Sequence, residues 1–98
     1  MSEQSVHIAT LFFELHLPAS GSLKSKRMIL KSLKDRIRAR FNVAVAEIGH
    51  WDKWQRALLG VCAIGSEKKV LESSLQKVLS LVEATSEIHV TQNRIEFS

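Results

Sequence analysis

Cysteine and proline each occur only once in the sequence, and glycine occurs only four times. The single Cys62 excludes an internal disulfide, and neither CxxC nor Cys/His ligand spacing is present, so we expect no metal and no cofactor. Long hydrophobic runs are also absent, because Glu14 and His16 interrupt the apolar segment near the N-terminus. That segment lacks the basic region and cleavage site of a signal peptide. We therefore expect a cytoplasmic protein that does not enter a membrane.

The size of the chain limits what it can build. Ninety-eight residues with 45% hydrophobic content predict one domain, residues 1–98, with a modest core and no deeply enclosed active site. The formal charge is +4 and the sequence pI is near 9.6. A basic protein of this kind favours acidic partners, above all nucleic acid.

Most of the basic residues lie in one segment, residues 22–41, SLKSKRMILKSLKDRIRARF. It contains eight of the fourteen Lys and Arg and one acid, Asp35, which is a charge of +7, whereas the rest of the chain carries −3. Apolar residues recur in it at helical spacing, which predicts an amphipathic helix packed on a core. These residues are Ile29, Leu30, Leu33, Ile37 and Phe41.

A second stripe on another face of this helix is cationic, and it suggests a polyanionic partner such as RNA. A face that only keeps the protein soluble is the alternative. Lys26 falls near the centre of the apolar stripe, so its ammonium must either reach solvent or pair with an acid such as Glu47. The residues that we assign to anion or nucleic-acid binding are Lys24, Lys26, Arg27, Lys31, Lys34 and Arg38.

The remaining elements follow from apolar periodicity. Strands are expected over residues 5–17, 41–48, 56–65 and 87–97, and a second helix over 67–84, capped by Ser66. The second helix is expected to bury a stripe that includes Val70. The resulting order, β-α-β-β-α-β, predicts an α+β ferredoxin-like fold with a four-stranded antiparallel sheet and both helices on one face. Its first and third strands would be central.

Two irregularities are expected within these strands. Gly60, in the middle of the third strand, is typical of a bulge or a close backbone approach. In the last strand the apolar face changes between Val90 and Ile95, which predicts a bulge or turn near Gln92 and Asn93.

Several motifs resemble one known family. The patterns S-L-K-x-K-R, F-N-V-x-V-A-E and W-Q-x-A-x-L-G, all within residues 22–60, are similar to those of the small bacterial YlxP-like proteins, whose function is not assigned. The resemblance implies a ferredoxin-like fold. It also implies a link to translation or ribosome assembly, because genes of that family often lie beside those of translation initiation factor two and ribosome-binding factor A. A ribosomal subunit is therefore a further expected partner.

The open face of the predicted sheet has two possible uses. RNA-recognition domains of this topology stack bases on aromatic residues of both central strands, but residues 56–65 contain no aromatic residue, so stacking there is not expected. An apolar patch on this face would instead meet a second copy of the chain or another protein. The residues expected to form this homodimer contact are Val6, Ile8 and Phe12.

The loop after the second strand concentrates polar and aromatic residues. Carboxylates and an imidazole at close spacing could serve acid–base chemistry or hold a ligand, but the spacing matches no known catalytic or metal-binding pattern, so no catalytic residue is assigned. We expect Trp54 to cover the core, whereas Trp51 could be exposed. His7, His16 and His89 are scattered with no evident pairing and are expected to be surface or strand-packing residues. The candidate ligand loop comprises Glu47, His50, Trp51, Asp52, Trp54 and Gln55.

Overall fold

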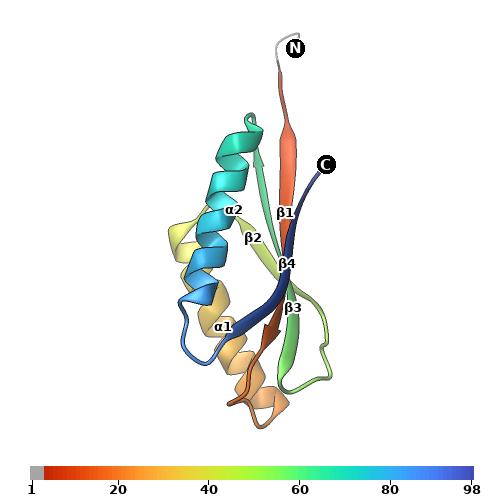
Figure 1. Ribbon diagram of the computed structural model, residues 1–98, viewed down its shortest axis with the longest axis vertical. Helices are drawn as coiled ribbons and strands as arrows, with labels where there is room; N and C mark the ends of the chain where they lie inside the picture. The colour runs from red at the N-terminus through yellow and green to blue at the C-terminus, as the bar shows by residue number, and fades with distance from the viewer. Residues whose placement is uncertain (1–3) are drawn as a thin grey trace.

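The computed structural model describes residues 4–98, which form two helices and four strands (Figure 1). Both helices lie on one side of the sheet, and the other side is open (Figure 1). The elements in chain order are β1 (His7–His16), α1 (Leu23–Arg40), β2 (Ala44–Gly49), β3 (Arg56–Gly65), α2 (Lys68–Glu83) and β4 (His89–Phe97).

The sheet has the strand order β2-β3-β1-β4, and every neighbouring pair is antiparallel. β1 and β3 are therefore central, as their apolar sequences predict. α2 packs against β1, β3 and β4, whereas α1 packs against β2 and α2. This arrangement confirms the predicted ferredoxin-like α+β fold.

Buried and more exposed residues alternate along β1, so one side of the strand faces the core and the other faces the open side of the sheet. Ala9, Leu11, Phe13 and Leu15 are at most 1% exposed and face the helices, whereas the residues between them line the open face. Leu17 extends the buried row beyond the strand. The helices complete this core with residues at helical spacing, namely Leu30, Leu33 and Ile37 from α1 and Leu71, Leu75, Val78 and Val82 from α2.

The ends of α1 follow from its flanking residues. Ser22 has extended backbone angles, and its side chain accepts a hydrogen bond of 3.0 Å from the backbone N–H of Ser25, which satisfies one free donor of the first turn. Phe41 returns to extended geometry and ends the helix, while its N–H still donates to Ile37. The predicted helix therefore exists within one residue of its expected bounds.

The start of α2 differs from the prediction in two ways. Its N-cap is Glu67, which makes no side-chain capping bond, so the expected cap by Ser66 is wrong. Val70 is 56% exposed and does not belong to the buried stripe. It borders a groove of about 370 Å³ whose lining includes Phe41, the first residue after α1, so α1 does not extend over this part of α2.

Strand irregularities fall near their expected positions in one case only. Gly60 pairs in register with both Phe12 and Ala46, so it does not form a bulge. A Cβ there would lie 3.4 Å from the Ile48 side chain, an ordinary van der Waals distance, so the expected close backbone approach is not present either. In β4, the register against β1 shifts at Thr91, one residue from the predicted bulge. Within residues 4–98, neither helix combines the length and apolarity that crossing a membrane requires.

Candidate nucleic-acid interface

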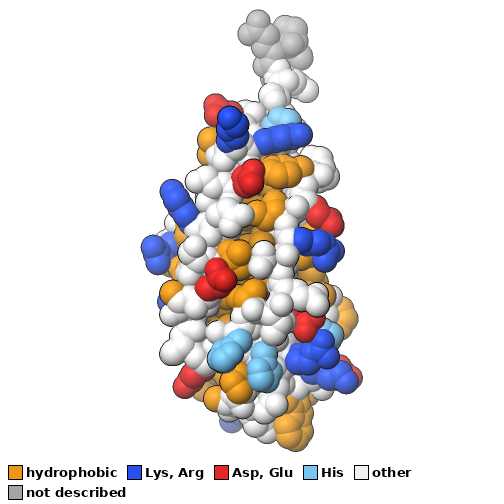
Figure 2. Space-filling view, viewed as in Figure 1, with side chains coloured by type: hydrophobic (Ala, Val, Ile, Leu, Met, Phe, Trp, Pro, Cys, Tyr) orange, Lys and Arg blue, Asp and Glu red, His pale blue; other side chains and the backbone are white. Residues whose placement is uncertain are grey.

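The solvent side of α1 carries most of the residues expected to bind anions. Lys24, Arg27, Lys31 and Arg38 are exposed and Lys34 is half-buried. They lie outside the apolar stripe of the helix, which packs against the core. We call these five residues the basic ridge. The face of the molecule shown in Figure 2 is different, since Lys and Arg there are interspersed with Asp and Glu.

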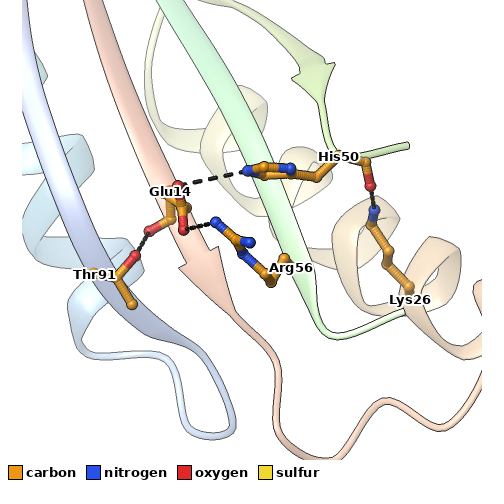
Figure 3. Close-up of polar contacts among 5 residues, drawn as sticks. All are labelled: Glu14, Lys26, His50, Arg56 and Thr91. Carbon is orange, nitrogen blue, oxygen red and sulfur yellow. Dashed lines mark hydrogen bonds and ion pairs between the residues drawn. The ribbon is translucent and has the colours of Figure 1, made fainter. Parts of the chain in front are cut away.

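Lys26 does not belong to the basic ridge. Its side chain is 2% exposed, and Nζ lies 2.9 Å from Oε2 of Glu47, at ion-pair distance. Nζ also donates a 2.6 Å hydrogen bond to the backbone carbonyl of His50. Figure 3 shows this bond between Lys26 on α1 and the loop after β2. A buried, paired ammonium does not reach phosphate, so the assignment of Lys26 to the anion-binding surface is wrong. The expected alternative, a pair with Glu47, is present.

The ridge residues differ in how much of their charge is free. Lys31 pairs with Asp35 at 2.9 Å, and this hydrogen bond lowers the pKa of the Asp35 carboxyl. Arg38 donates to the backbone carbonyl of Val45 at 3.0 Å, so it also secures edge strand β2. Lys24, Arg27 and Lys34 form no ion pair with residues 4–98, which leaves these three cations available to a partner.

The loop between β2 and β3 is polar and outward-facing. Trp51 is 64% exposed, and its indole N–H donates to the backbone carbonyl of Glu47 at 3.3 Å. Trp54 is 55% exposed, so the expectation that it covers the core is wrong. The core end is closed instead by the buried Leu17, whose N–H donates to the Gln55 carbonyl at 2.8 Å.

A polar cluster that the sequence did not indicate connects this loop to the open face of the sheet (Figure 3). Arg56 donates to Oε1 of Glu14 at 2.8 Å, and His50 Nε2 lies 3.5 Å from the other oxygen. The pKa of the Glu14 carboxyl is lowered, first by the Arg56 hydrogen bond, and burial opposes this shift. Thr91 on β4 donates its hydroxyl to the Glu14 carbonyl at 3.3 Å.

The strand register explains why this cluster was missed. Glu14 lies opposite Leu58, so Arg56 is its diagonal neighbour on the same face, within reach of long side chains. The same register brings β1 and β4 together so that the rings of His16 and His89 lie edge to face, 6.1 Å apart, although the sequence suggested no such pairing. Only the register could have indicated these contacts.

The proposed acid–base residues of the loop have other partners. Glu47 pairs with Lys26, and the His50 ring faces Glu14 rather than Glu47 or the exposed Asp52. No group of three His, Cys, Asp or Glu suited to a metal ion occurs among residues 4–98. The loop therefore offers an exposed surface rather than a convergent set of titratable groups.

The open face of the sheet exposes aliphatic side chains at one end. Ile8 and Ile64 are directly opposite each other on β1 and β3 and are 37% and 68% exposed, and Val6 is 61% exposed. Phe12 is half-buried, because the Arg94 guanidinium lies 4.4 Å from the centre of its ring. Two of the three predicted contact residues are thus exposed, and Ile64 joins them.

Almost the whole chain matches one known protein family. Residues 8–95 match the family described as Protein of unknown function (DUF503). The chain belongs to this family. That membership agrees with the YlxP-like resemblance of residues 22–60.

One relative of this DUF503 protein and one solved structure illustrate the range of similarity. The uncharacterized protein YlxP of Bacillus subtilis (strain 168) is 41% identical over 78 residues, which are 80% of this chain and 85% of the relative. A solved structure, LarC2, the C-terminal domain of a cyclometallase involved in the synthesis of the NPN cofactor of lactate racemase, is 15% identical with a TM-score of 0.41. The match covers 94% of this chain, which spans only 56% of that neighbour.

Proposed function

We propose that this DUF503 protein is a small, non-enzymatic, cytoplasmic binding module that contacts the phosphate backbone of RNA through the basic ridge of α1. The observation that carries this proposal is the position of Lys24, Arg27 and Lys34. They lie on the solvent side of one helix and form no ion pair within residues 4–98, although the protein has acids elsewhere on its surface.

The geometry of the ridge suits a backbone more than a single small anion. From Lys24 to Arg38 the helix rises about 21 Å at 1.5 Å per residue, so the cations are spread along a line that can follow several phosphates. Lys and Arg in such a row position a nucleic acid without reading its bases. Ribosomal RNA, alone or in the small subunit, is the partner to test first because of the YlxP-like resemblance.

A salt titration of RNA binding tests the proposal. We expect the variant Lys24→Gln/Arg27→Gln/Lys34→Gln to bind ribosomal RNA more weakly than the wild type. The slope of log affinity against log salt should become shallower by about 2, since each lost contact to a single strand removes about 0.7. Lys31 and Arg38 are kept because they hold Asp35 and Val45.

The matched control removes the same number of charges from the other helix. Lys68→Gln/Lys69→Gln/Lys77→Gln lowers the net charge equally, but all three exposed residues lie on α2. Its salt slope should equal that of the wild type. If both variants lose the same affinity, the effect is one of net charge. If the wild type does not bind at low salt, the proposal fails.

A second role is supported by the open face of the sheet. We propose that Val6, Ile8 and Ile64 meet the same residues of a second copy in a homodimer, because a two-fold contact pairs a patch with itself. Arg94 and Glu96, on neighbouring β4, pair with each other at 2.8 Å, so two copies would not bring unpaired like charges together there. This contact leaves the basic ridge, on the helical side, available to RNA.

A further inference from the structure

Both tryptophans of the protein lie exposed in the six-residue loop between β2 and β3. Trp51 and Trp54 are 64% and 55% exposed, and the chain contains no tyrosine. A tryptophan is among the most costly side chains to leave in water, and its flat ring is typical of binding surfaces. Since neither ring closes the core, their presence calls for a different explanation.

The loop is held at both ends rather than hanging free. At its start, the His50 carbonyl accepts hydrogen bonds from Lys26 at 2.6 Å and from the N–H of Lys53 at 3.0 Å. At its end, Gln55 is bonded through its backbone to Leu17, and its side-chain amide donates to the Pro18 carbonyl at 3.2 Å. The rings are thus presented by an anchored loop, and a ligand that stacks on them loses less affinity to loop ordering.

The same anchor places the loop beside the first turn of α1. Lys26 crosses from α1 to the loop in Figure 3, and the loop and the start of α1 lie at the same end of the molecule in Figure 1. Lys24 and Arg27, the first two residues of the basic ridge, flank Lys26 in the sequence and are exposed. Exposed cations and exposed aromatic rings therefore lie at the same end of the molecule.

Trp54 also borders a shallow hollow of about 460 Å³ at the edge of the open face. A flat ring system placed in it would lie against the indole of Trp54. The basic side chains of Lys53 and Arg56 also line the hollow and could contact an adjoining phosphate. The acidic Asp52 on its margin disfavours a phosphate path through the hollow itself. The other lining residues are His16, Lys53, Gln55 and Arg56.

We propose that the Trp51–Trp54 loop is a stacking platform for unpaired bases of single-stranded nucleic acid, whose phosphates continue along Lys24 and Arg27. This inference rests on the proposed function and narrows its partner. Stacking on an indole requires a free base face, which a duplex does not offer, and it is tolerant of sequence. The site differs from that of RNA-recognition domains because the aromatic rings lie in a loop rather than on the sheet.

Tryptophan fluorescence tests this directly, since the two loop residues are the only indoles in the full chain. We would titrate the protein with a single-stranded oligouridylate, a duplex of equal length, and inorganic polyphosphate. The single strand is expected to quench the emission, whereas polyphosphate should bind without quenching and the duplex should quench little. Trp51→Leu and Trp54→Leu each retain one reporter and should each weaken single-strand binding about fivefold or more.

Controls separate stacking from damage to the fold. Trp51→Phe and Trp54→Phe keep a ring that can stack and should restore part of the affinity that the Leu variants lose. Lys77→Gln, on α2, should bind the single strand as the wild type does. If all variants have the same urea unfolding midpoint as the wild type, the exposed rings do not contribute measurably to the stability of the fold.

Each remaining outcome is decisive. If the single strand binds without quenching and the Leu variants bind normally, the stacking platform is overturned while the basic ridge still stands. Equal quenching by the duplex overturns the preference for single strands. A concentration-dependent change in emission without RNA, together with no RNA quenching, assigns the loop to a protein contact instead. If no polyanion binds at low salt, the proposed function fails together with this inference.

Discussion

Lys26 shows how one basic residue of a cationic helix serves the fold instead of a partner. Its ammonium is buried against Glu47 and the His50 carbonyl, and it joins α1 to the end of β2. A charge removed from water in this way needs a counter-charge and hydrogen bonds, because its desolvation costs several kcal/mol. Oε2 of Glu47 lies at ion-pair distance but accepts no well-aligned hydrogen bond, so the short bond to His50 holds the ammonium in place.

Breaking this pair from the acidic side should therefore destabilise the protein strongly. Glu47→Leu leaves a buried ammonium without its carboxylate, and we expect the free energy of unfolding to fall by about 3 kcal/mol. The double variant Lys26→Met/Glu47→Leu removes both charges and should recover at least half of that loss. Urea denaturation measures both values. A single variant as stable as the wild type would mean that the His50 carbonyl alone satisfies the ammonium.

At the scale of elements, Glu14 acts as a clip between strands and loop. Its carboxylate accepts a hydrogen bond from Arg56 on β3 and lies near the His50 ring in the loop after β2. Its backbone carbonyl accepts a hydrogen bond from Thr91 on β4. The register shift at Thr91 lies opposite Glu14 and Leu15, so the clip and the irregular part of the β1–β4 pair coincide. We expect the ionised carboxyl to strengthen this contact between the strands and the loop.

The pH dependence of this clip follows from the lowered pKa of Glu14. A carboxyl whose folded pKa is lowered stabilises the protein above its ordinary value of 4.5, and this contribution is lost as the pH falls through the folded pKa. Arg56→Gln should raise the pKa of Glu14 toward the ordinary value. Its stability deficit relative to the wild type should be largest at neutral pH and should shrink in acid.

A carbon-detected NMR titration of the Glu14 carboxyl, with urea denaturation at neutral and acidic pH, measures both effects. Lys53→Gln is the matched control, because it removes one positive charge from the loop that precedes Arg56, and Lys53 is not among the residues that lower the pKa of Glu14. An unchanged Glu14 pKa in Arg56→Gln would show that the 2.8 Å contact is not maintained in solution.

At the scale of the whole molecule, the basic ridge and the aliphatic patch of Val6, Ile8 and Ile64 lie on different sides. The ridge lies on the helical side and the patch on the open side of the sheet. The loop between β2 and β3, which carries both tryptophans, lies at the end where α1 begins (Figure 1). This separation would let one copy make both proposed contacts, with RNA and with a second copy, at the same time. A dimer would present two ridges, which would raise the apparent affinity for a long strand.

The proposed homodimer makes a prediction of its own. Ile64→Glu should shift the protein from dimer to monomer in sedimentation velocity, because the substitution places a charge at the centre of the aliphatic patch. Ile64 is 68% exposed, so the unfolding free energy of the monomer should change by only about 0.5 kcal/mol. Met28→Glu, with a side chain 66% exposed on α1, is the control and should leave the mass unchanged. A monomeric wild type at high concentration would contradict the proposal.

Local pattern was enough to predict the elements and the fold. The alternation of β1, the stripe of α1 and the order of the six elements all reflect contacts repeated every two or every 3.6 residues. Such periodicity can be read from consecutive residues, and few chain topologies are compatible with the resulting order of elements. Local pattern failed at Val70, because how far a helix is covered depends on where its neighbour ends.

The sequence by itself determined the fold class, the central strands and the cationic side of α1, since these depend on residue type and spacing. Only the tertiary structure decided that Lys26 is buried, that Glu14 meets Arg56 and that Trp54 is exposed. Each of these depends on strand register or on the path of a loop. Register and loop path are set by contacts between residues far apart in the chain, and no short segment contains that information.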